Sequence, residues 1–236
     1  MRISLINPNT SRAMTDKIGL TAREVAGLDV TIDAVCPEFG LAAIESHSDE
    51  AQAALAVLRE VERGEAAGVD GFVIACFGDP GLDAAREVAT GPVVGIAQAA
   101  MHVATLAGRS FSVVTTLSRT LGRAQDLVRR YGFAEACVSM YATGIPVLDL
   151  EAASAESFEA IAGTCERAVR ADAADSIVLG CAGMTDLCEA LSERVGVPVI
   201  DGVAASVGLV SGMLRMGVGT SKRDEYADPR VDVRAA

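Results

Sequence analysis

Short apolar runs alternate with longer amphipathic stretches along the whole chain. The apolar runs predict eight strands, at residues 2–6, 29–35, 71–75, 93–96, 111–115, 137–140, 176–180 and 197–200. Segments rich in Ala, Glu and Arg lie between them and predict helices such as 49–66, 118–131 and 155–170. Apolar runs without clean alternation are typical of strands covered on both faces, so the pattern predicts parallel sheets flanked by helices in an α/β fold.

The chain also repeats part of its own pattern. VDGFVIACFGD (69–79) and ADSIVLGCAGM (174–184) each place a cysteine two residues before a glycine, 105 positions apart. Two further pairs of segments correspond in the same way, 91–95 with 196–201 and 2–11 with 111–120. A repeat of this length predicts two similar α/β halves that face each other.

The turns that follow four of these strands are the candidate functional region. In open parallel sheets, ligands bind beyond the carboxyl ends of the strands. The turns NPNTS, CFGD, TTLS and CAGM all follow such ends, two in each half. We therefore expect them to line a cleft between the two halves.

Composition excludes several classes of partner. The formal net charge is −12 and the chain has no Trp, which argues against nucleic acid and anionic membranes as partners. The apolar run near the N-terminus is too short for a signal peptide, and no apolar stretch is long enough to span a membrane. These features predict a cytoplasmic protein.

The six cysteines are expected to be free thiols. They form no C-x-x-C pair, and the only two histidines, His47 and His102, lack metal-ligand spacing with them. Cys76 and Cys181 stand apart because each ends a strand and precedes a small-residue turn that leads to a helix. The helix N-terminus is expected to favour the thiolate, and the amides of Gly78 and Gly183 are expected to hold a carbonyl oxygen that gains negative charge.

Two symmetry-related cysteines suggest acid–base chemistry rather than one covalent nucleophile. A single nucleophilic cysteine usually needs a neighbouring base, which two histidines at unrelated positions supply poorly. A carbon acid between two thiols can lose a proton to one sulfur and regain a proton from the other on the opposite face. With each sulfur about 3–3.5 Å from the reacting carbon, the sulfurs are expected to lie roughly 7 Å apart.

Motifs along nearly the whole chain resemble the hydantoin racemase family, a branch of the aspartate/glutamate racemase superfamily that includes allantoin racemases. The resemblance is carried by INPNTS, VIACFGDPGLDAAREV, PVVGIAQAA, SIVLGCAGM, VGVPVIDGVAAS and GTSK. It implies two pseudo-symmetric α/β domains with the active site between them, and Cys76 and Cys181 as paired acid and base. It also implies no pyridoxal phosphate or metal, and a homo-oligomer. The chain is expected to cross back, giving domains of 1–104 plus 206–236, and 105–205.

One departure from the superfamily pattern points to the substrate class. Amino-acid racemases of this type carry Cys-Asn-Thr and Gly-Cys-Thr where this chain has CFG and CAG. The resemblance therefore implies a neutral cyclic ureide, a 5-monosubstituted hydantoin, against Phe77, Ala182, Gly78 and Gly183. Four further residues are expected to bind the ring or, alternatively, to cap the following helix: Asn9, Thr10, Thr115 and Thr116.

Other functions stay open at this point. Allantoin racemase differs only in the substituent on the substrate. A decarboxylase of the same superfamily is disfavoured because such enzymes work with one cysteine. A binding protein without turnover and a thiol-based redox sensor are alternatives from other classes.

Overall fold

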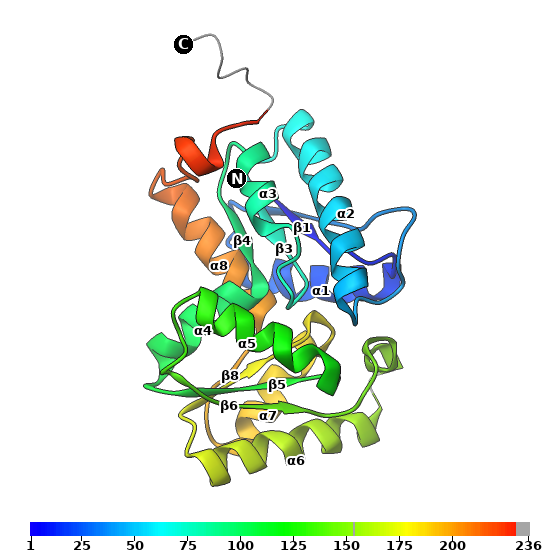
Figure 1. Cartoon of the computed structure of the whole chain (residues 1–236), viewed down its shortest axis with the longest axis vertical. Coiled ribbons are helices and arrows are strands. Elements are labelled where there is room, and N and C mark those ends of the chain that lie inside the picture. The colour runs from blue at the N-terminus through cyan, green and yellow to red at the C-terminus, as the bar shows by residue number, and fades with distance from the viewer. Residues whose placement is uncertain (153, 230–236) are drawn as a thin grey trace.

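Two parallel four-stranded sheets form the framework of this computed structural model, which describes residues 1–152 and 154–229 (Figure 1). The first sheet has the order β2-β1-β3-β4, with β1 Arg2–Ile6, β2 Thr31–Val35, β3 Gly71–Ile74 and β4 Val93–Gly95. The second has the order β6-β5-β7-β8, with β5 Phe111–Thr115, β6 Cys137–Ala142, β7 Ser176–Leu179 and β8 Val199–Ile200. The predicted α/β fold with two parallel sheets is confirmed.

The repeat seen in the sequence is also a repeat in the topology. Both sheets have the same strand order, and every pairing is parallel. Ile3 of β1 pairs with Gly71, and Phe111 of β5 pairs with Ser176. Gly71 and Ser176 are 105 positions apart, the same offset as the two cysteines, so β3 and β7 are equivalent strands.

The expected strands are all present, with small differences at their ends. No end differs by more than two residues, as at β8, which is expected from residue 197 but observed only at Val199–Ile200. Pro198 lacks an N–H group and contributes only its carbonyl, which accepts from Ile177 of β7. The expected helix 118–131 starts as a 3₁₀ turn at Ser118–Thr120 before it becomes α-helical.

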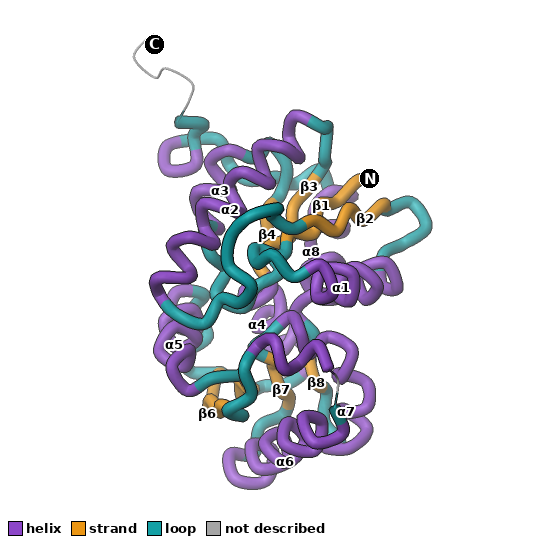
Figure 2. The backbone as a smooth tube through the Cα atoms, turned by 90° about the vertical axis from the view of Figure 1, so that its right-hand side faces the viewer, coloured by secondary structure: helices purple, strands orange, loops and turns teal. Residues whose placement is uncertain are grey.

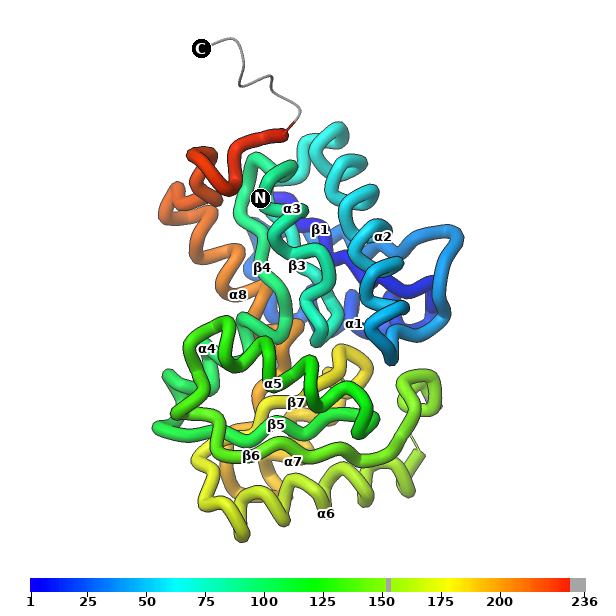
Figure 3. Tube along the Cα trace, viewed as in Figure 1, coloured from blue at the N-terminus to red at the C-terminus, as the bar shows by residue number. Residues whose placement is uncertain are grey.

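Eight α-helices and three further 3₁₀ turns complete the described residues (Figures 2 and 3). The helices are α1 Arg12–Val25, α2 His47–Ala66, α3 Leu82–Val88, α4 Ile96–Ala107, α5 Leu121–Arg130, α6 Ala155–Asp172, α7 Cys188–Val195 and α8 Gly202–Arg215. The turns are Val147–Ala152, Ala182–Leu187 and Asp224–Tyr226. Among the described helices, none has the length and apolarity needed to cross a lipid bilayer.

The N-termini of α1, α2 and α6 share one local cause. Ser11, Ser46 and Ser154 precede them, and each serine side chain accepts a hydrogen bond from the backbone N–H three residues later. These bonds satisfy an N–H group that has no partner within the helix. The placement of α1 and α2 matters for function because both helices carry side chains into the cleft.

Helices α4 and α8 tie the two halves together. Helix α4 follows β4 of the first sheet but packs against β7 of the second. Helix α8 follows β8 of the second sheet but packs against β3 and β4 of the first, and it also contacts α4. The largest apolar cluster therefore contains residues of both sheets, among them Ile3, Leu5, Phe111 and Val113. The domain limits 1–104 plus 206–236 and 105–205 stay a prediction.

Asp79 links the turn after Cys76 to the start of α4. Its buried carboxylate accepts hydrogen bonds from the N–H groups of Ala97 (3.1 Å) and Gln98 (3.0 Å) and from the Tyr131 hydroxyl (2.7 Å). A Cβ atom at Gly95 would lie 2.2 Å from this carboxylate, so only glycine leaves room for it. Burial raises the pKa of Asp79 to about 6, despite these donors.

We expect Asp79 to make the protein less stable as the pH rises. A carboxyl group whose pKa is higher in the folded state than in the unfolded chain contributes stability below the unfolded pKa and loses it as the pH passes the folded pKa. Relative to D79N, the wild-type free energy of unfolding should fall by about 2 kcal/mol between pH 4 and 7. Urea unfolding of both proteins at several pH values measures this difference, and parallel pH profiles would contradict it.

Candidate active site

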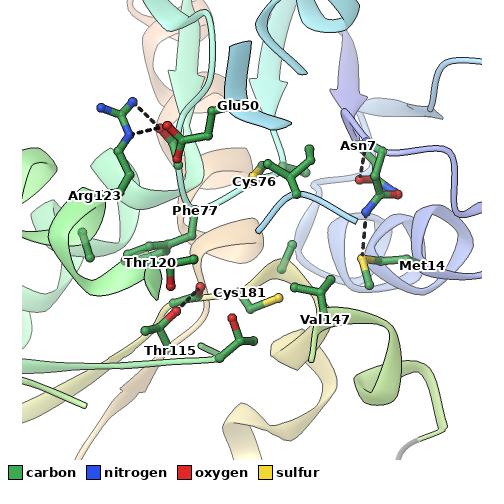
Figure 4. A pocket seen from close by; sticks show the side chains of 18 residues that line it. Asn7, Met14, Glu50, Cys76, Phe77, Thr115, Thr120, Arg123, Val147 and Cys181 are labelled. Atoms are coloured by element: carbon green, nitrogen blue, oxygen red, sulfur yellow. Dashed lines mark hydrogen bonds and ion pairs between the residues drawn. The ribbon is translucent and has the colours of Figure 1, made fainter. Parts of the chain in front are cut away.

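A small cavity lies between the carboxyl ends of the two sheets (Figure 4). It holds about 60 Å³ of space accessible to water, and one water needs about 10–15 Å³ of such space. The cavity therefore suits a small ring rather than a nucleotide or a peptide. Its walls are formed by Asn7, Asn9, Met14, Ile44, Glu50, Ala75, Cys76, Phe77, Gly78, Thr115, Thr116, Thr120, Arg123, Ala124, Val147, Gly180, Cys181 and Ala182.

Cys76 and Cys181 both line this cavity, one from each half. Cys76 lies just after β3 and Cys181 just after β7, and Figure 4 shows them on opposite sides of the pocket. Both are free thiols, and both are partly buried. The equivalent strands thus bring the two sulfurs to one site.

The glycine two residues after each cysteine holds its sulfur. The N–H of Gly183 donates to Sγ of Cys181 over 3.4 Å, and the N–H of Gly78 forms the corresponding bond to Cys76. We expected these amides to bind a carbonyl oxygen of the ligand. The structure directs them at the sulfur atoms instead, where they stabilise negative charge on the thiolate.

The expected lowering of the thiol pKa values is wrong for this structure. Burial raises the pKa of Cys76 to about 12 and that of Cys181 to about 11, and the glycine amides offset only part of the effect. The helix contribution is weak because Cys181 precedes a 3₁₀ turn. Cys76 lies six residues before the seven-residue helix α3.

The remaining residues expected from the sequence divide into two groups. Six line the cavity, namely Asn9, Phe77, Gly78, Thr115, Thr116 and Ala182. Gly183 and Thr10 lie outside the lining. The Thr10 hydroxyl instead donates to the carbonyl of Leu41 (3.3 Å) and anchors the loop that follows β2.

Hydrogen bonds hold the asparagine and threonine side chains in place. Asn7, which we did not single out, donates to Oδ1 of Asn9 (2.8 Å) and to Oγ1 of Thr15 (3.0 Å). Thr115 donates to the carbonyl of Gly180 (3.0 Å), and its Oγ1 lone pairs stay available as acceptors. The turn NPNTS therefore supplies one amide more to the cavity than the sequence indicated.

One end of the cavity carries an ion pair that sequence reasoning missed. Glu50 of α2 and Arg123 of α5 face each other in Figure 4, with Arg123 Nε 3.1 Å from the Glu50 carboxylate. Burial raises the pKa of Glu50, and Arg123 opposes that rise. A Cβ atom at Gly78 would lie 2.6 Å from Oε1 of Glu50, so a side chain there would displace this carboxylate. In the sequence, both residues look like ordinary charged positions on the solvent-exposed face of an amphipathic helix. Only the packing of the two halves shows that they face the cavity.

Apolar side chains from two loops close another side of the cavity. Ile44 comes from the loop before α2, and Val147 begins the turn before α6. Glu45 joins the two loops because its carboxylate accepts the N–H of Val147 over 2.9 Å. The loop 40–46 is thus part of the site wall.

We find no metal centre among residues 1–152 and 154–229. No group of three or more His, Cys, Asp or Glu side chains in these ranges is arranged to hold a metal ion. The chemistry offered by the described side chains is that of two thiols, two asparagines, three threonines and one ion pair.

Several proteins of similar sequence and structure are named racemases. A hydantoin racemase from Rhizobium meliloti is 46% identical over 235 residues, covering 100% of this chain and 98% of its own length. An allantoin racemase structure from Klebsiella pneumoniae is 50% identical, with a TM-score of 0.96 and coverage of 98% of this chain and 94% of that one. An allantoin racemase structure from Pseudomonas fluorescens is 38% identical, with a TM-score of 0.94 and coverage of 98% and 97%.

The family profile described as Asp/Glu/Hydantoin racemase matches residues 3–210, which include both cysteines and both sheets. The resemblance proposed from the motifs is therefore confirmed. This chain belongs to the Asp/Glu/Hydantoin racemase family.

Proposed function

We propose that this protein is a racemase of 5-monosubstituted hydantoins that uses Cys76 and Cys181 as acid and base. The observation that carries the proposal is the pair of thiols on opposite sides of one small cavity. Relatives named hydantoin racemase, at 46% and 44% identity over nearly the full length, support the same substrate class. A homo-oligomer and a cytoplasmic location stay predictions.

The reaction needs one thiolate and one thiol at the start of each turnover. The thiolate takes the proton from C5, the C–H electron pair moves into the ring as an enolate, and the opposite thiol gives its proton to the other face of C5. The first sulfur ends as a thiol and the second as a thiolate. Protons and charge balance without a further reactant, and exchange with water restores the starting state.

The raised thiol pKa values have a use in this mechanism. A base removes a proton from carbon more readily when its own pKa approaches that of the carbon acid. Burial makes each thiolate a stronger base, at the cost of a small thiolate fraction near neutral pH. Burial therefore lowers the fraction of each cysteine that is thiolate and raises the basicity of that thiolate.

The cavity lining suits a neutral ring with polar edges. Phe77, Ala182 and Val147 present apolar surface, while Asn9 and Thr116 bring amide and hydroxyl groups to the same wall. Oδ1 of Asn9 already accepts from Asn7 and from the Ser11 N–H, so its Nδ2 group is the part that can donate to a ring carbonyl. These residues are proposed as substrate contacts together with Gly78 and Thr115, while Cys181 and Cys76 flank the stereocentre.

Allantoin is the second candidate substrate. It carries a ureido group in place of an alkyl or aryl substituent. The Glu50–Arg123 pair offers a carboxylate acceptor and a guanidinium donor for such a group, and the similar structure from Klebsiella pneumoniae is titled allantoin racemase. A non-catalytic binding protein has no comparable support.

We expect C76A and C181A each to lose racemase activity by about 10³-fold, because each removes either the base or the acid of the proton transfer. Optical rotation or chiral chromatography of a 5-alkylhydantoin measures the loss, and reactions in heavy water should label C5 of the wild-type product with deuterium. C137A is the matched control, because Cys137 is a partly buried thiol outside the cavity. Racemisation by either site variant at more than a tenth of the wild-type rate would exclude the two-thiol mechanism.

The raised pKa of each thiol predicts a steep dependence of activity on pH. Below a pKa of about 11, the thiolate fraction rises about tenfold for each pH unit. Wild-type kcat/KM should therefore increase by about that factor per unit between pH 7 and 9. Initial rates at each pH test this, with circular dichroism as the check that the protein stays folded. A kcat/KM that stays constant over this range in a folded protein would show that the free enzyme already holds its thiolate near neutral pH.

Initial rates with allantoin and with 5-methyl- and 5-benzylhydantoin distinguish the two substrate classes. We expect a higher kcat/KM for the alkyl and aryl hydantoins than for allantoin. The opposite order would favour the allantoin assignment. Binding of all three compounds without deuterium entry at C5 would leave only the non-catalytic function.

A further inference from the structure

Two cations cross the cleft and bind equivalent positions of the opposite half. Lys17 of α1 belongs to the first half, and its Nζ donates to the carbonyl of Gly183 over 2.9 Å. Arg123 of α5 belongs to the second half, and its Nη2 donates to the carbonyl of Gly78 over 2.8 Å. Gly78 and Gly183 are the two glycines 105 positions apart, each two residues after a cysteine.

The two contacts correspond in their surroundings as well. Helices α1 and α5 follow the equivalent strands β1 and β5. Each cation also pairs with a carboxylate, Lys17 with Asp186 (2.7 Å) and Arg123 with Glu50 (3.1 Å). The two halves therefore make the same kind of contact across the cleft, one with a lysine and the other with an arginine.

Each glycine connects a cation to a sulfur through its own backbone. The carbonyl of Gly183 accepts from Lys17 while its N–H donates to Cys181 Sγ. The carbonyl of Gly78 accepts from Arg123 while its N–H donates to Cys76. Bonds from charged donors are stronger than neutral ones, and these side chains are only 20% and 27% exposed, so the contacts are weakly screened.

We propose that Lys17 and Arg123 are crossed positioning residues: each reaches from one half to hold the cysteine turn of the other half and so sets where that sulfur meets the substrate. The catalytic part of this assignment rests on the proposed racemase function. The holding contact itself does not depend on that function. Neither cation is assigned a proton-transfer step.

The charges around the two sulfurs differ. Lys17 lowers the pKa of Cys181, and Glu45 opposes it. Asp79 and Glu50 both raise the pKa of Cys76. The two turns are therefore alike in geometry, while the charged groups near the two sulfurs differ.

The test compares K17M and R123M with R12M and R129M, which remove exposed charges from the same two helices. We expect kcat of K17M and R123M to fall by about 10²-fold with KM changed much less, because a small misplacement of a reacting group is costly. The two control variants should keep wild-type kcat. K17R and R123K should recover part of the loss, since each restores a cationic donor.

A second readout resolves the crossing and does not require turnover. Iodoacetamide alkylation of Cys76 and Cys181, followed by mass spectrometry of their peptides from pH 7 to 10, measures each thiol separately, with Cys137 as internal reference. K17M should raise the apparent pKa of Cys181 by about half a unit, which slows its alkylation about threefold, and leave Cys76 unchanged. R123M should change the alkylation rate of Cys76 and leave Cys181 unchanged.

Two results would overturn the proposal. One is a kcat within about twofold of wild type in both K17M and R123M. The other is an alkylation change at the cysteine of the same half, or equally at both cysteines. If the wild type fails to exchange C5 hydrogen with any hydantoin, the racemase function is wrong, while the alkylation pattern still decides the crossed contact.

Discussion

The exchange of helices α4 and α8 between the two sheets is the constraint on which the site depends. Each helix leaves the edge of one sheet and packs on the other, so their buried residues form one core with both sheets. The contact is close because a Cβ atom at Gly202 would lie 2.8 Å from the carbonyl oxygen of Ile96. Packed interiors resist deformation, so a core shared by both halves limits how far the cleft can widen. The proposed mechanism, in which two thiols act on opposite faces of one small ring, needs such a limit.

Burial has two opposed effects on this site. It removes water from Cys76 and Cys181, which raises their pKa values, and it also strengthens the hydrogen bonds that reach them. Among the described residues, the direct donors to the two sulfurs are backbone amides, those of Gly78 and Gly183. Backbone amides cannot titrate. These donors therefore stabilise a thiolate without adding an acidic group of their own.

Much of the fold and part of the site followed from the sequence, for local reasons. Short segments of sequence are enough to locate the strand ends, the 105-residue repeat and both cysteines. The apolar pattern and the turn residues of each segment determine its local structure. Asn9, Thr115 and Thr116 were found because they lie at or within three residues of a strand's carboxyl end. Local pattern is sufficient where the ligand-facing residue is part of the turn itself.

The residues that sequence reasoning missed act across the cleft. Glu50, Lys17 and Arg123 lie within helices, where a charged side chain normally faces water, and only the packing of the two halves turns them inward. The pKa error had a similar origin, because desolvation depends on residues from both halves while the helix argument used only the adjacent turn. Thr10 was misplaced because the loop carbonyl of Leu41, 31 residues away, takes its hydroxyl.

The unlike charges around the two sulfurs have a consequence for how mirror-image molecules share this enzyme. Two enantiomers have the same free energy in water, so the overall equilibrium is even and kcat/KM must be equal in the two directions. Lys17 on one side and Asp79 with Glu50 on the other allow the two bound complexes to differ in energy all the same. The enantiomer that binds more tightly then has a lower KM and a kcat that is lower by the same factor. A protein built from two similar halves can thus have different kcat and KM values for the two enantiomers, although the equilibrium between them is even.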